Sequence, residues 1–262
     1  MRLHKYIANC GYTSRRRAEL LIHAGRVKVN GTIVTEMGFD MDPEKDRVSI
    51  NDDRVTPPER LTIILHKLPG YISSTHDTHD RLTVMDLLPR RMREIGVMPV
   101  GRLDQDTTGL LVLTNDGTLN HRITHPSFEI EKEYVAEVEG SPSREALHRI
   151  EEGILLEGEK TAPAKVFDIQ PLGGRTRLHV VISEGRKRQI KKMFDALGHP
   201  VISLGRVRIG DLKLGNLPPG QWRKLHPGEI EAVLGKKGNR RPEGRIGEME
   251  TDPEELDCPE ED

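Results

Sequence analysis

The sequence predicts an α+β protein in which a small helix–helix–hairpin module precedes a larger domain with a mixed, largely antiparallel sheet flanked by helices. Two observations support this class. Residues 1–56 hold two short amphipathic segments followed by alternating apolar and charged residues, whereas residues 61–235 alternate between apolar strand-like runs and short helical patterns. The proline-containing stretch 57–60 reads as a linker, and 262 residues suffice for two domains.

Two helices and a hairpin are expected in the first module. Apolar residues recur at helical spacing over residues 2–9, and Thr13 or Ser14 is placed to cap a second helix over residues 15–23, which ends before Gly25. The segments that follow are a strand at 27–29, a tight turn at Asn30-Gly31, a return strand at 32–35 and a further strand at 48–50.

Strands and helices are expected to alternate in the second domain, with glycine and asparagine at the turns between them. The predicted strands are 61–66, 109–114, 134–138, 165–170, 177–182 and 201–208. The predicted helices are 83–88, 118–124, 143–152 and 188–197. The sequence contains no repeat of 20–50 residues.

Charge is distributed very unevenly along the chain. The last twenty residues, 243–262, hold ten acids and one arginine, a net charge of −9. Because the net charge of the whole chain is −2, the other 242 residues carry a net charge of +7. Residues 1–30 alone carry seven bases against one glutamate. Basic clusters on a folded body suit phosphate binding. The charged, proline-punctuated segment 236–262 is predicted to be a disordered acidic tail.

Composition excludes several classes of protein. No run approaches the roughly 20 apolar residues of a membrane-spanning helix. Cys10 and Cys258 are the two cysteines, which provide neither a disulfide framework nor the spacing of metal ligands, and the histidines are scattered. We therefore expect a cytoplasmic protein without a metal site or membrane partner. No dimerisation signature is present, so a monomer is the default expectation.

One candidate for chemistry is the aspartate of Gly101-Arg102-Leu103-Asp104, just before the apolar strand at 110–113. A carboxylate at the edge of a loop beside a cation is well placed to act as a nucleophile or base. Spacing alone favours the simpler interpretation that Asp104 caps a turn. The rest of the chain decides between the two interpretations.

The first module resembles the S4-like RNA-binding domain. The resemblance is carried by Arg15, Arg16 and Arg17 on the second helix and by the segment Ala24-Gly25-Arg26-Val27-Lys28-Val29-Asn30-Gly31. Three arginines in a row are more often a solvated helix face, but the hairpin at the expected spacing favours RNA binding. The resemblance implies RNA contacts from Arg15, Arg16, Arg17 and Lys28.

The whole of residues 1 to about 230 resembles the ribosomal-RNA pseudouridine synthases of the small-subunit-enzyme type. Five blocks occur in the order typical of that family: Leu65–Ser74, Gly101–Gly117, Lys132-Glu133-Tyr134, Glu184–Phe194 and Val207-Arg208-Ile209-Gly210. The resemblance implies isomerisation of uridine to pseudouridine, which needs no cofactor because neither a redox change nor net hydrolysis occurs.

The resemblance also assigns roles to individual residues. Asp104 takes the place of the nucleophilic aspartate, and Lys191 that of a basic partner, where many relatives have arginine. Tyr134 corresponds to a tyrosine that stacks near the target base and helps remove the proton from carbon 5. Arg102 matches an arginine that holds the gap left by a flipped-out base. Further RNA contacts are predicted at Lys67, Arg186, Lys187 and Arg188.

We therefore predict an enzyme that isomerises a specific uridine in ribosomal RNA, either free or within a pre-ribosomal particle, with large-subunit RNA slightly favoured. One alternative is a non-catalytic RNA-binding assembly factor, against which Asp104, Tyr134 and Lys191 argue. Another is a carboxylate-based nucleoside or glycoside hydrolase. That class requires a second catalytic carboxylate, and the nearest acids, Asp106 and Asp116, resemble turn residues.

Overall fold

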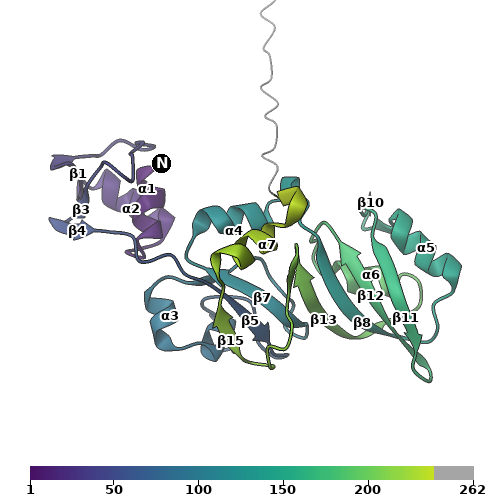
Figure 1. Cartoon of the computed structure of the whole chain (residues 1–262). Helices are drawn as coiled ribbons and strands as arrows, with labels where there is room; N and C mark the ends of the chain where they lie inside the picture. The colour runs from purple at the N-terminus through teal and green to yellow at the C-terminus, as the bar shows by residue number, and fades with distance from the viewer. Residues whose placement is uncertain (239–262) are drawn as a thin grey trace, which may run out of the picture.

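The computed structural model describes residues 1–238 and confirms the α+β class (Figure 1). In the first module, helices α1 (Leu3–Asn9) and α2 (Arg15–His23) pack on a four-stranded sheet of order β2-β1-β3-β4. The Ser14 hydroxyl accepts a hydrogen bond from the Arg17 amide at 3.3 Å, so Ser14 rather than Thr13 is the cap. The strands are β1 (Val27–Val29), β2 (Thr32–Ile33), β3 (Val48–Ile50) and β4 (Asp53–Val55).

A nine-stranded mixed sheet forms the larger domain, with the order β11-β12-β8-β13-β7-β5-β15 and β14 and β6 attached at the side. Among the described strands, β13 (Val201–Ile209) and β7 (Thr108–Thr114) run parallel, and the other neighbours are antiparallel. The remaining strands are β5 (Thr62–Lys67), β6 (Met98–Pro99), β8 (Lys132–Glu139), β9 (Leu155–Leu156), β10 (Glu159–Lys160), β11 (Lys165–Pro171), β12 (Arg175–Ile182), β14 (Leu212–Lys213) and β15 (Trp222–Lys224). Of these, β9 and β10 form a separate hairpin.

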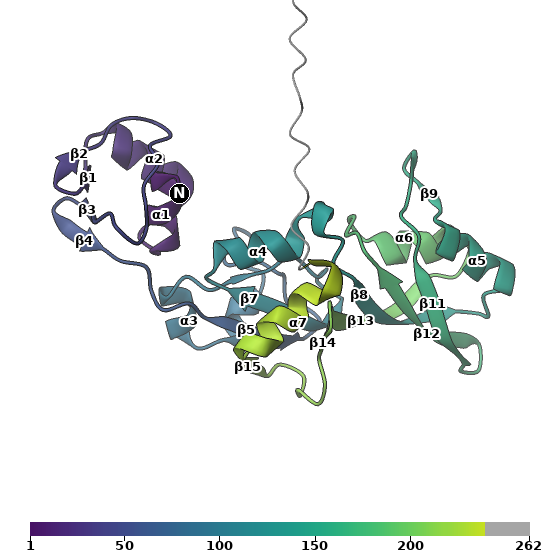
Figure 2. The same ribbon diagram turned by 45° about the horizontal axis from the view of Figure 1, so that its top comes forward.

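Helices cover both faces of this sheet (Figure 2). One face packs against the 3₁₀ turn η1 (Val84–Leu87) and helices α3 (Arg90–Glu94), α5 (Arg144–Glu152) and α6 (Gln189–Asp195). The other packs against α4 (Gly117–Thr124) and α7 (Pro227–Gly238), with the 3₁₀ turn η2 (Pro126–Phe128) after α4. Strands β5 and β7 are buried on both faces, which explains their unbroken apolar runs.

The structure differs from the sequence-based expectations at several elements. The segment expected to be helical at 83–88 is the 3₁₀ turn η1, and the helix expected at 188–197 is shorter. Elements not predicted are β4, β6, β9, β10, β14, β15, α3, η2 and α7. Helix α7 runs past the expected start of the tail at residue 236 and continues to Gly238. The rest of the predicted disordered tail, 239–262, lies outside the described residues.

Candidate active site

A cavity of about 490 Å³ opens where β8 and β13 meet the loop before β7. Its walls come from three separate parts of the chain: the loop Gly101–Asp104 with Thr107, strand residues Tyr134, Ile182 and Leu204, and the segment Gly185–Ile190. The predicted residues Asp104, Tyr134, Arg102, Arg186, Lys187 and Arg188 therefore line one site. Apolar side chains and cations both line the wall, which suits a flat polar base joined to a phosphate backbone.

The loop that carries Asp104 is held from below by the segment 67–73. The Ser73 hydroxyl donates to the Leu103 carbonyl and accepts from the Leu103 amide, both at 3.0 Å. The Gly70 amide donates to the Gln105 carbonyl at 2.8 Å. These bonds fix the backbone on both sides of Asp104. Its carboxylate is half-buried and makes no hydrogen bond within residues 1–238, so it faces the cavity instead of capping the turn.

Lys67 lies beneath this loop, and the prediction that it contacts RNA is wrong. Its side chain is fully buried, with an exposed fraction of 0%. The Nζ atom donates to the carbonyls of Leu68, Gln105 and Thr107 at 3.0, 3.1 and 2.8 Å. Burial lowers the pKa of Lys67 to about 8, while the nearby carboxylates of Asp106 and Asp104 act in the opposite direction. A phosphate has no access to this ammonium group.

Lys191 pairs with Asp106 rather than with Asp104. Its Nζ atom lies 2.5 Å from Asp106 Oδ1 and is mostly buried, whereas the Asp106 side chain is mostly exposed. The hydrogen bond from Lys191 lowers the pKa of Asp106 and favours its ionised form. Lys191 thus lies next to the loop that carries Asp104, but its ion-pair partner is Asp106, two residues further along the chain. Sequence reasoning regarded Asp106 as a turn residue and missed this pair.

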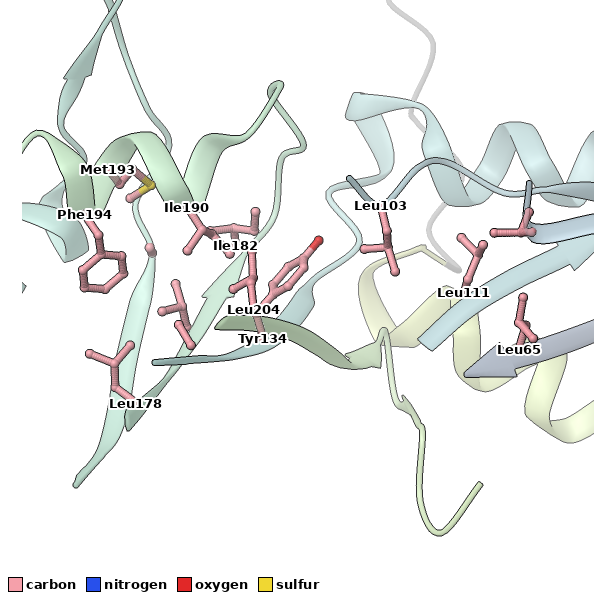
Figure 3. Close-up of a cluster of buried hydrophobic side chains, with 14 of the residues drawn as sticks. Leu65, Leu103, Leu111, Tyr134, Leu178, Ile182, Ile190, Met193, Phe194 and Leu204 are labelled. Carbon is pink, nitrogen blue, oxygen red and sulfur yellow. The ribbon is translucent and has the colours of Figure 1, made fainter. Parts of the chain in front are cut away.

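Tyr134 projects from β8 into the cavity and is 8% exposed. Figure 3 shows its ring beside Leu204, with the hydroxyl directed to the side on which Leu103 lies. Asp104 and Tyr134 are thus on opposite sides of the junction between β13 and β7, and both line the same space. A carboxylate and a phenol from separate elements thus line one cavity.

The basic residues of the rim differ in their surroundings. Lys187 and Arg188 are exposed, whereas Arg186 is half-buried and bonded to Glu184 and to the carbonyls of Glu159 and Lys160 in the β9–β10 hairpin. Lys187 and Arg188 are therefore the more available phosphate ligands.

In the first module, the arginine run lies exposed on α2 and does not line this cavity. Lys28 is bound to Asp52 at 2.5 Å, so an RNA contact there competes with an existing ion pair. Within residues 1–238, no cluster of three or more potential metal ligands occurs, and no helix is long and apolar enough to cross a bilayer.

The fold and site define an RNA-modifying enzyme built from a binding module and a catalytic domain. The chain belongs to the RNA pseudouridylate synthase family: the model of that family matches residues 61–196, and the S4 domain model matches residues 1–48.

Relatives of known name match over nearly their whole length. The ribosomal large subunit pseudouridine synthase B of Bacillus subtilis (strain 168) is 43% identical over 237 residues, which cover 88% of this chain and 95% of that protein. An uncharacterized RNA pseudouridine synthase of Aquifex aeolicus (strain VF5) is 42% identical over 238 residues, covering 89% and 94%. A crystal structure of a pseudouridylate synthase superposes with a TM-score of 0.63 at 36% identity and covers 89% of this chain and 99% of that one.

Proposed function

We propose that this enzyme isomerises a uridine of ribosomal RNA, with large-subunit RNA as the substrate. The observation that carries the proposal is that Asp104 and Tyr134, brought together from a loop and a strand, line one cavity whose rim is basic. The 43% identity to a protein named as a large-subunit enzyme supports the choice of RNA.

The reaction balances without any added group. The bond between N1 of uracil and C1′ of ribose breaks, the ring turns, and a bond forms between C5 and C1′. C5 then loses its proton and N1 gains one, so the product is an isomer of the substrate. Asp104 supplies the carboxylate nucleophile. Tyr134 stacks against the ring and assists loss of the C5 proton.

The cations have separate tasks in this proposal. Arg102, exposed at the mouth of the cavity, holds the gap left when the uridine leaves its stack. Lys187 and Arg188 bind the adjoining phosphates. Lys191 stabilises the negative charge of the Asp104–Asp106 loop. The exposed arginines of α2 bind a structured part of the same RNA.

The test is release of tritium from ribosomal RNA that is labelled at C5 of uridine and taken from cells lacking this protein. The wild type should release tritium, and Asp104→Asn should release none while binding the RNA equally well. Asp195→Asn, which alters an exposed acid at the end of α6, is the matched control and should behave as wild type. Equal RNA binding without release by the wild type would instead support an assembly factor.

We further propose a cytoplasmic monomer that acts on free RNA or on a pre-ribosomal particle. The lack of a dimerisation signature in the sequence supports the monomeric state. Light scattering measures the mass in solution. Tritium release from naked RNA and from isolated particles, compared at equal concentration, identifies the substrate.

A further inference from the structure

A buried arginine that has no counter-ion among residues 1–238 lies behind the cavity. Arg206, on β13, is 3% exposed, and its Nε atom donates to the Leu110 carbonyl at 2.8 Å. Its Nη2 atom is buried and has no hydrogen-bond partner within residues 1–238. No carboxylate in that part of the chain lies within ion-pair distance of Arg206 either. The neighbouring arginine on the strand, Arg208, is by contrast bound to Glu133 at 2.7 Å.

This arrangement is costly for the folded protein. Transferring a charge out of water is unfavourable unless the charge is paired and fully hydrogen-bonded. Buried polar atoms without partners are rare in proteins, and each calls for an explanation. Only one other buried side-chain atom among the described residues lacks a partner, the hydroxyl of Thr107, which lines the cavity itself. Both unsatisfied groups therefore belong to the surroundings of one site.

The register of the sheet shows what the guanidinium contacts. Arg206 pairs with Tyr134 across β13 and β8, so the two side chains stand on the same face. The guanidinium carbon lies 6.0 Å from the centroid of the tyrosine ring, in the range of a cation–π contact. On the other side, Arg206 pairs with Gly109, where a side chain would collide with the Arg206 backbone. The arginine is thus held between β7 and β8.

We propose that Arg206 is a positioning residue for Tyr134, which sets the ring against the target base by means of a buried positive charge behind it. This inference rests on the proposed function of the site. Arg206 does not line the cavity and its free nitrogen is buried, so it acts through Tyr134 rather than on the RNA. Because the charge holds the Tyr134 ring in place, this role explains why the fold retains a buried charge without a partner. Burial, with a smaller contribution from the charge of Arg206, lowers the pKa of Lys132 to about 8.

The test compares Arg206→Met with the wild type in single-turnover tritium release, with thermal unfolding measured beside it. Replacing a buried unpaired charge by an apolar group of similar volume leaves the free energy of unfolding unchanged or raises it. We expect the melting temperature to stay equal or to rise, the RNA concentration at half-maximal rate to change little, and the rate to fall about 100-fold, as expected for a displaced catalytic group. Arg177→Met, which alters an exposed arginine on β12, is the matched control and should match the wild type.

Two further variants make the inference falsifiable. If Arg206 acts through the ring of Tyr134, the double variant with Tyr134→Leu, which removes the ring, is no slower than Tyr134→Leu alone. If the rate reductions of the two single variants multiply in the double variant, the inference is overturned. A wild-type rate in Arg206→Met would overturn it as well. Should Arg206→Met fail to fold, Arg206→Gln decides: it keeps hydrogen-bonding groups but loses the charge, so a reduced rate with unchanged RNA binding supports the inference and a wild-type rate refutes it. Wild-type protein that releases no tritium would instead refute the proposed function.

Discussion

Replacement of Lys67 by methionine is expected to destabilise the protein, in contrast to the same replacement at Arg206. Both cations are buried, but the Lys67 Nζ atom satisfies three carbonyl groups, whereas Arg206 satisfies one. Removing the lysine head leaves those carbonyls without partners inside the domain. Breaking a buried charged arrangement from one side costs about 3–5 kcal/mol.

This loss of unfolding free energy can be converted to a change in melting temperature. For a chain of this size, each kcal/mol changes the melting temperature by about 2–4 °C, so Lys67→Met should melt about 10 °C lower. Relief of the cost of burying the charge opposes this loss. We expect the hydrogen bonds to dominate because all three protons of the ammonium group have acceptors.

The same replacement should slow the reaction even in folded protein. Two of the three carbonyls belong to Gln105 and Thr107, which follow Asp104 in its loop. Loss of their common anchor lets the carboxylate move, and a displacement of about 1 Å costs about 100-fold in rate. Binding of RNA should be unchanged because Lys67 does not reach the surface.

The assays are thermal unfolding by circular dichroism and single-turnover tritium release well below the melting temperature. Lys213→Met, which alters an exposed lysine on β14, is the control for loss of one positive charge. A Lys67→Met protein that melts with the control and reacts at the wild-type rate would refute the anchoring role. Weaker RNA binding with normal turnover would restore the RNA contact first predicted from the sequence.

Three further outcomes are expected. Gly109→Ala should lower the free energy of unfolding in urea by about 3 kcal/mol or more, because φ is +100° and the added Cβ would collide with the backbone oxygen of Arg206 on β13. Gly158→Ala is the control, since Gly158 has φ +88° but open space around it. It isolates the cost of the backbone conformation, about 1 kcal/mol. Ser14→Ala should cost about 1 kcal/mol through loss of the α2 cap, and an unchanged urea midpoint would contradict that role. Burial lowers the pKa of Lys67 and of Lys132 from 10.5 to about 8, so the unfolded chain binds more protons between these values and stability rises with pH across that window. Lys132→Met should therefore show a smaller gain in urea midpoint between about pH 7.5 and about pH 9.5 than the wild type, and an equal gain would exclude this residue as a source.

Sequence patterns located the elements that are amphipathic or uniformly apolar. The helices of the first module and the strands β5 and β7 have periodicities that leave little choice of structure. Strands of two residues, such as β9 and β14, are too short to show any period. Helix α7 contains a glycine with non-helical backbone angles at Gly235, and this interruption hid the helix in the sequence.

The site was predictable where a residue's role depends on its own motif and not where the role depends on distant partners. Asp104 and Tyr134, whose catalytic roles stay predictions, line one cavity. Lys67 follows an apolar strand and resembles an exposed strand end, but its acceptors lie 38 and 40 residues further on. Arg206 stands in an alternating Arg-Val-Arg pattern typical of a solvated strand. Only the packing of β13 between β7 and β8 shows that it is buried.

The narrow junction between β13 and β7 has a mechanical consequence. Eight residue pairs join β12 to β8 and six join β5 to β7, whereas two join β13 to β7 in the described sheet. A sheet bends most easily where few backbone hydrogen bonds resist, and along the main strand order of the described sheet this junction has the fewest paired residues. Asp104 and Tyr134 stand on opposite sides of the line. A small rotation of one half against the other about this line would therefore change the width available to a base.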